Sequence, residues 1–288
     1  MAPSTSLETL TLADDLTVTR MGYGAMQLAG PGVFGPPKDR GAAIAVLREA
    51  VDLGITHIDT SDFYGPYVVN EIIREALYPY PEGLHLVTKV GAQRGEDGSW
   101  IPSLTPESLV RQVHENLDRL GLEALDVVNL RVEGHEISAG DPLAEQFSVL
   151  AKLQHEGLIR HLGVSGVTPA QLTEAQQIAP VVTVQNLYNL AQRQDDPLVD
   201  RCAREGIAFA PFFPLGGFTP LQSDALDRVA HRLNASAQQV ALAWLLQRSP
   251  AIVLIPGTSS VEHLRENVAA ASLELPDDAL AGLNAVGQ

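Results

Sequence analysis

Three side chains near the ends of two apolar stretches could together form a proton donor. The stretch GITHIDTSDFY at residues 54–64 contains Asp59 and Tyr64, and the stretch LVTKV at residues 86–90 contains Lys89. Tyrosine is a poor acid at neutral pH, because its unperturbed pKa is about 10. A neighbouring cation, itself held by a carboxylate, would lower that pKa and make the phenol usable in acid catalysis. The residues alone also allow a structural interpretation, in which Asp59 caps a helix, Lys89 is solvated and Tyr64 packs in a loop.

The chain alternates apolar segments with segments of helical periodicity, and this order predicts how the three side chains are positioned. The predicted strands are residues 21–30, 56–61, 84–90, 124–131, 159–166, 181–186, 207–213 and 251–257. Nearly all-apolar strands that alternate with helices are typical of a parallel sheet covered by helices. Eight such units predict an α/β fold, the (β/α)8 TIM barrel. A doubly wound sheet is the alternative, but the glycines of residues 21–30 lack the G-x-G-x-x-G spacing that binds a dinucleotide.

Shorter signals define the ends of this barrel and of its helices. Residues 8–20 alternate around a turn-like Ala-Asp-Asp, which predicts a β-hairpin plug ahead of the first barrel strand. Asp39 and Thr105 stand where they can cap the helices that follow them, and Thr105 is followed by a proline. No segment has the length and polarity of a linker, so we predict a single domain over residues 1–288.

The composition indicates a globular protein without nucleic-acid or membrane partners. The formal net charge is −16 at pH 7, which disfavours nucleic acids and anionic membrane surfaces. The single cysteine, Cys202, excludes an intrachain disulfide and is too few for a thiolate metal site. The N-terminus lacks a signal-peptide pattern, and no window holds the roughly 18 uninterrupted apolar residues of a membrane span. We therefore expect a soluble cytoplasmic protein, a monomer or weak homo-oligomer, that acts on a small molecule.

In such a barrel the active site lies at the C-terminal ends of the strands, and here these ends are rich in polar residues. The residues expected there are Gly24, Met26, Gln27, Asp59, Tyr64, Lys89, Asn129, Arg131, Ser165, Gln185, Asn186, Phe212, Phe213, Gly257, Thr258 and Ser259. Gln185 and Asn186 could bind a ligand amide or hydroxyl, or bond neighbouring loop backbone. The Gly-Thr-Ser-Ser turn of residues 257–260 precedes a helix, and free amides at a helix N-terminus can bind phosphate. His57 and Asp59 form an H-x-D pair, but no histidine or acidic cluster follows at later strand ends, so we predict no metal site.

These motifs, in this order, resemble the aldo-keto reductase family over nearly the whole chain. The resemblance rests on GITHIDTSDFYG, LVTKVG, LDVVNL, IRHLGVSG, VVTVQNLYN, APFFPLGG and IPGTSSVEHLREN, together with the N-terminal hairpin. Within the family, VVNLR, PFFPLGGFTPLQS and ALAWLLQRSP are most similar to the bacterial pyridoxal reductase branch. The resemblance implies a barrel enzyme that reduces a carbonyl compound with NADPH.

The family uses an Asp-Tyr-Lys-His tetrad, and the resemblance implies roles for Asp59, Tyr64 and Lys89. Tyr64 would be the general acid, Lys89 would lower its pKa, and Asp59 would hold Lys89. Where the family usually has histidine at the end of the fourth strand, this chain has Arg131. Arginine stays protonated and presents a planar fork of donors, so it can stabilise developing negative charge but cannot relay a proton.

The resemblance also implies a set of residues that bind the cofactor. Ser165, Gly166 and Gln185 should face the nicotinamide amide, and Phe212 should stack on the nicotinamide ring, where the family commonly has tyrosine. The other cofactor residues by position are Gly24, Met26, Phe213, Pro214, Leu215, Gly217, Ile255, Gly257, Thr258, Ser259, Ser260, His263, Arg265, Glu266 and Asn267. The positions that often carry lysine or arginine for the 2′-phosphate carry neither here, although Arg265 is nearby. NADH is therefore a second candidate beside NADPH (NADP+).

Two functions follow from these observations. The first is an NADP-dependent oxidoreductase that reduces a pyridoxal-like or other small aromatic aldehyde to the alcohol, with Tyr64 as the proton donor. The second is a cofactor-binding regulatory or interaction module of the same fold, with weak or no catalysis, which the presence of Arg131 suggests. The loops expected to surround the substrate are residues 30–38, 93–101, 133–141 and 217–223.

Overall fold

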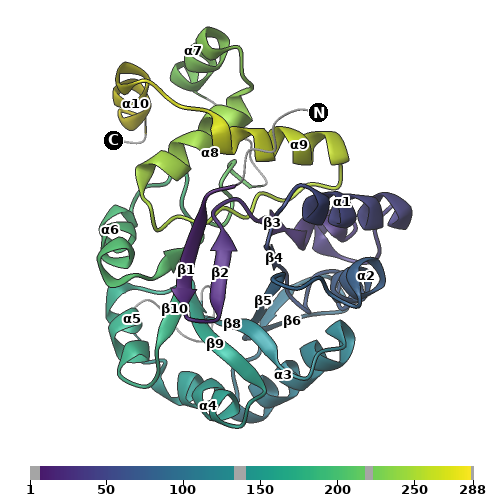
Figure 1. Ribbon diagram of the computed structural model, residues 1–288. Helices are drawn as coiled ribbons and strands as arrows, with labels where there is room; N and C mark the ends of the chain where they lie inside the picture. The colour runs from purple at the N-terminus through teal and green to yellow at the C-terminus, as the bar shows by residue number, and fades with distance from the viewer. Residues whose placement is uncertain (1–6, 133–140, 218–222, 287–288) are drawn as a thin grey trace.

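Seven parallel strands form one curved sheet with helices on its outer face (Figure 1). The computed structural model describes residues 7–132, 141–217 and 223–286. The strands, in their order across the sheet, are β11 (Ala208–Phe209), β10 (Val181–Gln185), β9 (Ile159–Ser165), β8 (Leu125–Arg131), β5 (His85–Val90), β4 (His57–Asp59) and β3 (Tyr23–Gly24). Every neighbouring pair is parallel, so all the C-terminal strand ends meet at one rim.

The eighth position of the sheet is filled by residues 252–257, which lack a regular strand ladder. Isolated parallel bridges join Phe209 to Ile252 on one side, and Met21 to Leu254 on the other. Pro256 has no N–H to donate, which explains why the ladder is interrupted there. A Cβ atom on Gly24 would lie 2.3 Å from the carbonyl oxygen of residue 255, so only glycine lets the two edges approach. The predicted (β/α)8 barrel is confirmed, with an irregular last strand.

Helices surround the barrel (Figure 1). They are α1 (Arg40–Asp52), α2 (Val68–Leu77), α3 (Pro106–Leu120), α4 (Ala144–His155), α5 (Pro169–Gln176), α6 (Asp196–Glu205), α7 (Asp224–Leu233), α8 (Ala237–Arg248), α9 (Val261–Ala269) and α10 (Asp277–Asn284). Two of them, α7 and α10, lie side by side outside this ring next to α8 (Figure 1). The predicted caps are confirmed: the side chain of Asp39 accepts from the amide of Ala42, and that of Thr105 from the amide of Ser108. Each cap satisfies an amide that the helix leaves unpaired.

The predicted N-terminal hairpin is present and crosses the open end of the barrel opposite the rim (Figure 1). Strands β1 (Thr9–Ala13) and β2 (Leu16–Thr19) pair antiparallel. Leu16 and Val18 are buried and pack against apolar side chains that point into the barrel, namely Val87, Val127, Val182, Ala208, Ala210 and Val253. The hairpin therefore closes the bottom of the barrel and leaves the rim open.

Three parts of the fold differ from the sequence prediction. The first barrel strand is only Tyr23–Gly24, because a 3-10 helix, Ala25–Leu28, follows at once. The segment predicted as a loop around residues 93–101 contains an antiparallel hairpin, β6 (Ala92–Arg94) and β7 (Trp100–Pro102). The C-terminal helix α10 was not predicted.

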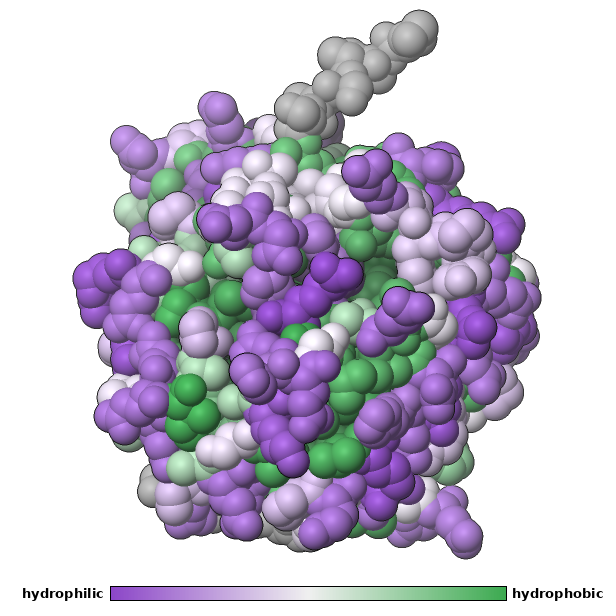
Figure 2. All heavy atoms as spheres, turned by 60° about the horizontal axis from the view of Figure 1, so that its bottom comes forward, coloured by the Kyte–Doolittle hydropathy of each residue, from purple (hydrophilic) through white to green (hydrophobic). Residues whose placement is uncertain are grey.

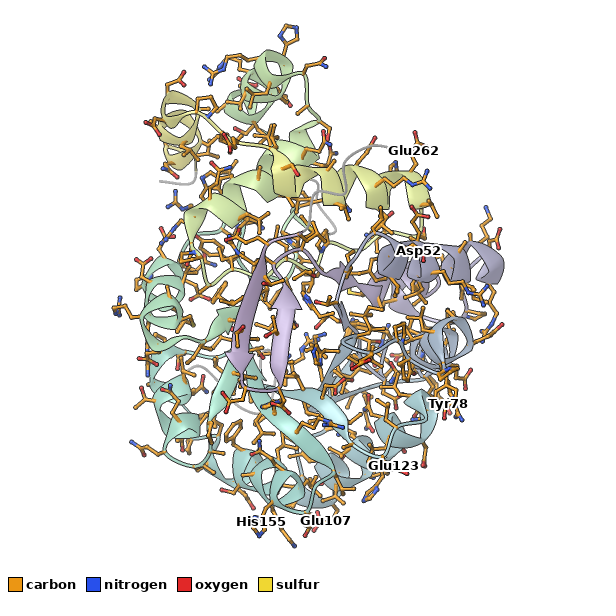
Figure 3. All side chains as sticks on the ribbon, in the orientation of Figure 1. Asp52, Tyr78, Glu107, Glu123, His155 and Glu262 are labelled. Atoms are coloured by element: carbon orange, nitrogen blue, oxygen red, sulfur yellow. The ribbon has the colours of Figure 1, made fainter. Side chains whose placement is uncertain are left out.

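The outer surface is mainly hydrophilic. Figure 2 shows a face on which polar and charged residues surround smaller apolar patches. Asp52, Glu107 and Glu262 lie at the exposed surface of α1, α3 and α9 (Figure 3). No helix within the described residues combines the length and apolar character needed to cross a membrane.

His57 is a buried histidine without a polar partner. It lies on β4, is only 3% exposed, and neither of its ring nitrogens has a hydrogen-bond partner within the described parts of the chain. Burial lowers the pKa of His57 to about 4, with a smaller contribution from His85. The folded protein therefore holds His57 as a neutral imidazole.

We expect the contribution of His57 to the free energy of unfolding to fall as the pH is lowered from about 6.5 to about 4. In this window the unfolded chain binds a proton at His57 while the folded chain does not, so protonation favours unfolding. The difference in pKa corresponds to about 3 kcal/mol at most. Urea unfolding at several pH values measures it, and His57→Gln should show a flatter dependence on pH. Parallel curves for the two proteins would contradict this account.

Candidate active site

A buried ion pair between neighbouring strands forms the base of the site. Asp59 ends β4 and Lys89 lies near the end of β5, and the two strands are adjacent and parallel. The ammonium nitrogen of Lys89 lies 2.6 Å from Oδ1 of Asp59 and donates to the carbonyl of Thr60 at 2.9 Å. The amide of Gln185, on β10, donates to Oδ2 of Asp59 at 2.8 Å. Both carboxylate oxygens are therefore held, as a buried charge requires.

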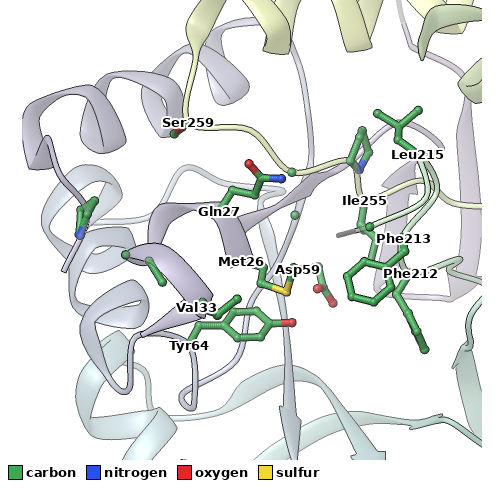
Figure 4. A pocket seen from close by; sticks show the side chains of 18 of the residues that line it. Met26, Gln27, Val33, Asp59, Tyr64, Phe212, Phe213, Leu215, Ile255 and Ser259 are labelled. Carbon is green, nitrogen blue, oxygen red and sulfur yellow. The ribbon is translucent and has the colours of Figure 1, made fainter. Parts of the chain in front are cut away.

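Tyr64 lies beside this pair, in the turn that follows β4. Its ring is buried, and the Lys89 nitrogen lies 5.3 Å from the ring centroid. Figure 4 shows Tyr64, Asp59 and Met26 around the same cavity. Asp59, Tyr64 and Lys89 thus lie together at the rim, where they were expected from the sequence.

The pKa of Tyr64 is raised, which corrects the expectation that Lys89 lowers it overall. Burial has the largest effect and raises the pKa, while Lys89 and Arg131 act in the opposite direction. The pKa of Lys89 is also raised: burial alone would lower it, but the neighbouring Asp59 and Tyr64 stabilise the cation. At neutral pH the folded protein therefore holds a protonated phenol next to a protonated amine.

Arg131 ends β8 and lies next to aromatic side chains. Its guanidinium carbon is 5.3 Å from the ring of Trp100 and 5.8 Å from the ring of Phe63. Phe63 in turn packs edge-on against Tyr64. Arg131 makes no hydrogen bond or ion pair with any residue in the described ranges, in contrast to most arginines there. Its donors are free for a ligand that is bound near Tyr64.

A buried polar network supports the loop between Asp59 and Tyr64, and sequence reasoning missed it. Thr60 donates through its hydroxyl to Oδ1 of Asn70, on α2, at 2.8 Å. Asn70 donates to Oδ1 of Asn116, on α3, at 3.0 Å, and Thr88 donates to the same oxygen at 2.6 Å. The network fixes Thr60, whose carbonyl accepts from Lys89. Polar residues within amphipathic helices gave no sequence signal for this role.

A second ion pair lies behind the same loop. Asp62 accepts from the amide of Asn70 at 3.2 Å and pairs with Arg119, on α3. Burial raises the pKa of Asp62 to about 7, although Arg119 acts in the opposite direction. The guanidinium carbon of Arg119 also lies 3.7 Å from the ring centroid of Tyr67. The turn that presents Tyr64 is thus anchored on both sides.

A cleft of about 510 Å³ runs along the rim from this site. It is bounded by the loops that follow β3 and β11 and by the turn before α9 (Figure 4). Its lining includes Asp59 and Tyr64 together with these predicted cofactor residues: Gly24, Met26, Gln185, Phe212, Phe213, Pro214, Leu215, Gly217, Ile255, Gly257 and Ser259. Its volume is in the range of sites for small molecules and cofactors.

The other predicted cofactor residues do not line the cleft as the structure stands. Ser165 and Gly166 lie at the end of β9, where the Gly166 amide donates to the side chain of Asn186 at 2.9 Å. The remaining ones, Thr258, Ser260, His263, Arg265, Glu266 and Asn267, belong to the turn before α9 and to α9 itself. The side chains of Thr258 and Ser260 accept from the amides of Ser260 and His263. Arg265 is bound to Glu49 at 2.7 Å.

Several lining residues were absent from the predicted cofactor set. Gln27 was expected at the rim, but Lys38, Asp39 and Ala42, at the start of α1, were not expected to touch a cofactor. The loop of residues 30–37 also lines the cleft in part. From the sequence, residues 30–38 were expected to surround the substrate and were given no role in binding the cofactor. Within the described ranges, no group of three or more His, Cys, Asp or Glu side chains could hold a metal ion.

A barrel closed below by a hairpin, with a buried Asp-Lys pair and a tyrosine beside a rim cleft, defines the class of this protein. The aldo/keto reductase family model matches residues 20–288, and the chain belongs to this family. It is 60% identical over 275 residues to pyridoxine 4-dehydrogenase of Escherichia coli K12, covering 94% of this chain and 96% of the relative. It is 44% identical to an uncharacterized oxidoreductase of Schizosaccharomyces pombe, covering 95% of this chain and 88% of the relative.

Solved structures agree with this assignment. A thermostable aldo-keto reductase crystallised with the inhibitor epalrestat superposes with a TM-score of 0.83 at 27% identity, over 98% of this chain and 100% of the other. An aldo/keto reductase from Klebsiella pneumoniae, crystallised with NADP and acetate, superposes with a TM-score of 0.78 at 26% identity. That match covers 96% of this chain and 94% of the other.

We expect Asp59 and Lys89 to be strongly coupled in stability. Asp59→Asn leaves a buried cation without its anion and Lys89→Met leaves the carboxylate without its cation, so each should lower the free energy of unfolding by about 3 kcal/mol or more. The double variant removes both charges and should lose less than the sum of the two single losses. Urea unfolding of the four proteins measures the coupling. Strictly additive losses would show that the pair does not act as a unit.

Proposed function

We propose that this protein reduces an aromatic aldehyde of the pyridoxal type to the alcohol with NADPH, and that Tyr64 donates the proton. The observation that carries the proposal is the position of Tyr64, beside the buried Asp59–Lys89 pair and on the wall of the cleft. The choice of substrate is supported by the 60% identity to the pyridoxine 4-dehydrogenase of E. coli. Pyridoxal, with an aldehyde on an aromatic ring, also suits the aromatic surroundings of Tyr64 and Arg131, which Phe63 and Trp100 provide.

The cleft fits a nicotinamide dinucleotide. It is continuous from Tyr64 to the turn before α9, it contains the Phe212 ring for stacking, and Ser259 lies at the side away from Tyr64 (Figure 4). When bound, NADPH supplies the hydride that reduces the carbonyl carbon. Gln185 lines the same cleft, and its side-chain N–H already donates to Asp59. Its side-chain carbonyl oxygen is therefore the atom that can accept a hydrogen bond from the nicotinamide amide.

The chain's own contribution is a proton and a positive environment for the carbonyl oxygen. Tyr64 remains protonated at neutral pH, and as its proton leaves, the phenolate is stabilised by the Lys89 cation nearby. Asp59 keeps Lys89 in place and charged. The substrate oxygen takes the proton from Tyr64 and becomes the alcohol hydroxyl.

We expect Tyr64→Phe to reduce kcat for aldehyde reduction by about 10²-fold or more, because the general acid is lost. The aromatic ring and its packing remain, so NADPH binding should change little. Steady-state kinetics and NADPH titration measure the two effects. Tyr80→Phe is the matched control, since its hydroxyl bonds the carbonyl of Leu120 and does not line the cleft. Full reductase activity in Tyr64→Phe would rule out the assignment of the acid.

Arg131 is proposed to take the place of the usual histidine by binding the carbonyl oxygen. It stands at the end of β8, its electrostatic effect reaches Tyr64, and its donors are not used by described residues. A fixed cation with directional donors stabilises the negative charge that develops on that oxygen. A guanidinium group, unlike an imidazole, can play this part but cannot relay a proton.

We expect variants at position 131 to separate charge from proton transfer. Arg131→Met should lower kcat by about 10²-fold, and Arg131→Lys should lower it less, because a cation remains. Arg131→His should be active at low pH and lose activity as the pH rises through about 6.5, where imidazole loses its charge. The activity of the natural protein should stay flat over that interval. A pH-rate profile of each variant checks this, and a flat profile for Arg131→His would contradict a requirement for charge.

The second function, a cofactor-binding module without catalysis, is tested by a panel of aldehydes. Pyridoxal, benzaldehyde and aliphatic aldehydes are compared with NADPH and NADH side by side. Turnover that is highest with pyridoxal and NADPH supports the enzyme proposed here. Tight NADPH binding without turnover of any aldehyde would favour the module. The cytoplasmic location, the monomeric or weakly oligomeric state and the single-domain organisation remain predictions.

A further inference from the structure

The preference for NADPH over NADH needs a positive charge that the expected positions do not supply. The two cofactors differ by one phosphate, on the 2′ oxygen of the adenosine ribose. Ser259 is the only residue of the α9 turn beyond Gly257 that lines the cleft, and it is uncharged. Arg265, the nearest arginine on α9, is not among the lining residues, and its Nε donates to Glu49 on α1 at 2.7 Å. On the α9 side the lining of the cleft therefore offers hydroxyls and amides but no cation.

Lys38 is the cation that the cleft does contain. Of the described residues that line it, the charged ones are Lys38, Asp39 and Asp59. Asp39 caps α1 by accepting from the Ala42 amide at 2.9 Å, and Asp59 is paired with Lys89. Lys38 makes no hydrogen bond or ion pair with any residue of the described ranges, and it is exposed. Its ammonium group can therefore reach a ligand without giving up a partner.

The position of Lys38 in the fold places it at the adenosine side of the cleft. It immediately precedes the cap of α1, and Ser259 immediately precedes Ser260, the cap of α9. The two helices pack together and are joined by the Arg265–Glu49 pair (Figure 1). Lys38 and Ser259, which stand just before the caps of these two packed helices, both line the cleft. In a protein of net charge −16, such a local group is needed to bind a polyanion.

We propose that Lys38 binds the 2′-phosphate of NADPH and sets the preference for NADPH over NADH. This inference rests on the proposed function, in that it assumes a nicotinamide dinucleotide in the cleft. It assigns the phosphate-binding charge to the loop between β3 and α1. Ser259 and the amides before α9 complete the site from the opposite wall.

Binding measurements on Lys38→Met test the inference without turnover. NADPH and NADH are titrated into the full-length protein by calorimetry, with 2′,5′-ADP and 5′-AMP as probes of the adenosine end. We expect the Kd for NADPH and for 2′,5′-ADP to rise about tenfold, because a charge-assisted contact is lost. The Kd for NADH and for 5′-AMP should change less than twofold. Lys38→Arg should retain most of the preference, and added salt should weaken it.

Arg265→Met is the matched control. It removes an arginine next to the same turn, and it should leave the NADPH to NADH ratio unchanged if Lys38 provides the charge. Equal weakening of NADPH and NADH in Lys38→Met would place Lys38 at the pyrophosphate and overturn the inference. So would an unchanged preference in Lys38→Met, or its loss in Arg265→Met. These results are independent of the proposed reaction: an absence of aldehyde turnover alongside a Lys38-dependent preference would refute the reaction and leave the phosphate site intact.

Discussion

The arrangement of the site depends on the buried pair of Asp59 and Lys89. Two charges inside a barrel of apolar side chains are costly unless each finds its partners, and breaking one such pair is worse than never having it. The ends of three strands provide these partners. Asp59 on β4 pairs with Lys89 on β5, and Gln185 on β10 donates to the second carboxylate oxygen of Asp59. The carbonyl of Thr60 takes another donor of Lys89. The Lys89 cation, which Asp59 must hold for the stability of the fold, is thus also the charge that acts on Tyr64.

A strongly acidic protein that binds a polyanionic cofactor has to separate its charges in space. The acidic groups Asp52, Glu107 and Glu262 are exposed on α1, α3 and α9 (Figure 3). Of the acidic side chains that line the cleft, Asp39 caps α1 and Asp59 is paired with Lys89, whereas Lys38 has no partner among the described residues. The lining of the cleft is thereby left with one available cation, Lys38 at the start of α1, while Arg131 lies near Tyr64 outside that lining.

Much of the fold could be predicted because its signals are local. Apolar strands, helix caps such as Asp39 and Thr105, and the alternation of residues 8–20 each depend on short-range chemistry, and all appear in the structure. The prediction errors occur where the pairing of one strand with another determines the secondary structure. Residues 92–102 form a hairpin only because two short strands pair with each other, and residues 252–257 join the sheet through scattered bridges. A pattern of residues along one strand does not reveal either.

The sequence by itself determined the residue types of the site and, through the order of strands and helices, that Asp59, Tyr64 and Lys89 share one rim. Only the tertiary structure decided their energetic balance. The burial of Tyr64 outweighs the neighbouring cations, so its pKa rises where the sequence suggested that it falls. The same holds for the cofactor end of the cleft, where Arg265 is bound to Glu49 and Lys38 has no hydrogen-bond or ion-pair partner among the described residues. Burial and partner choice are properties of groups far apart in the chain, and no local pattern encodes them.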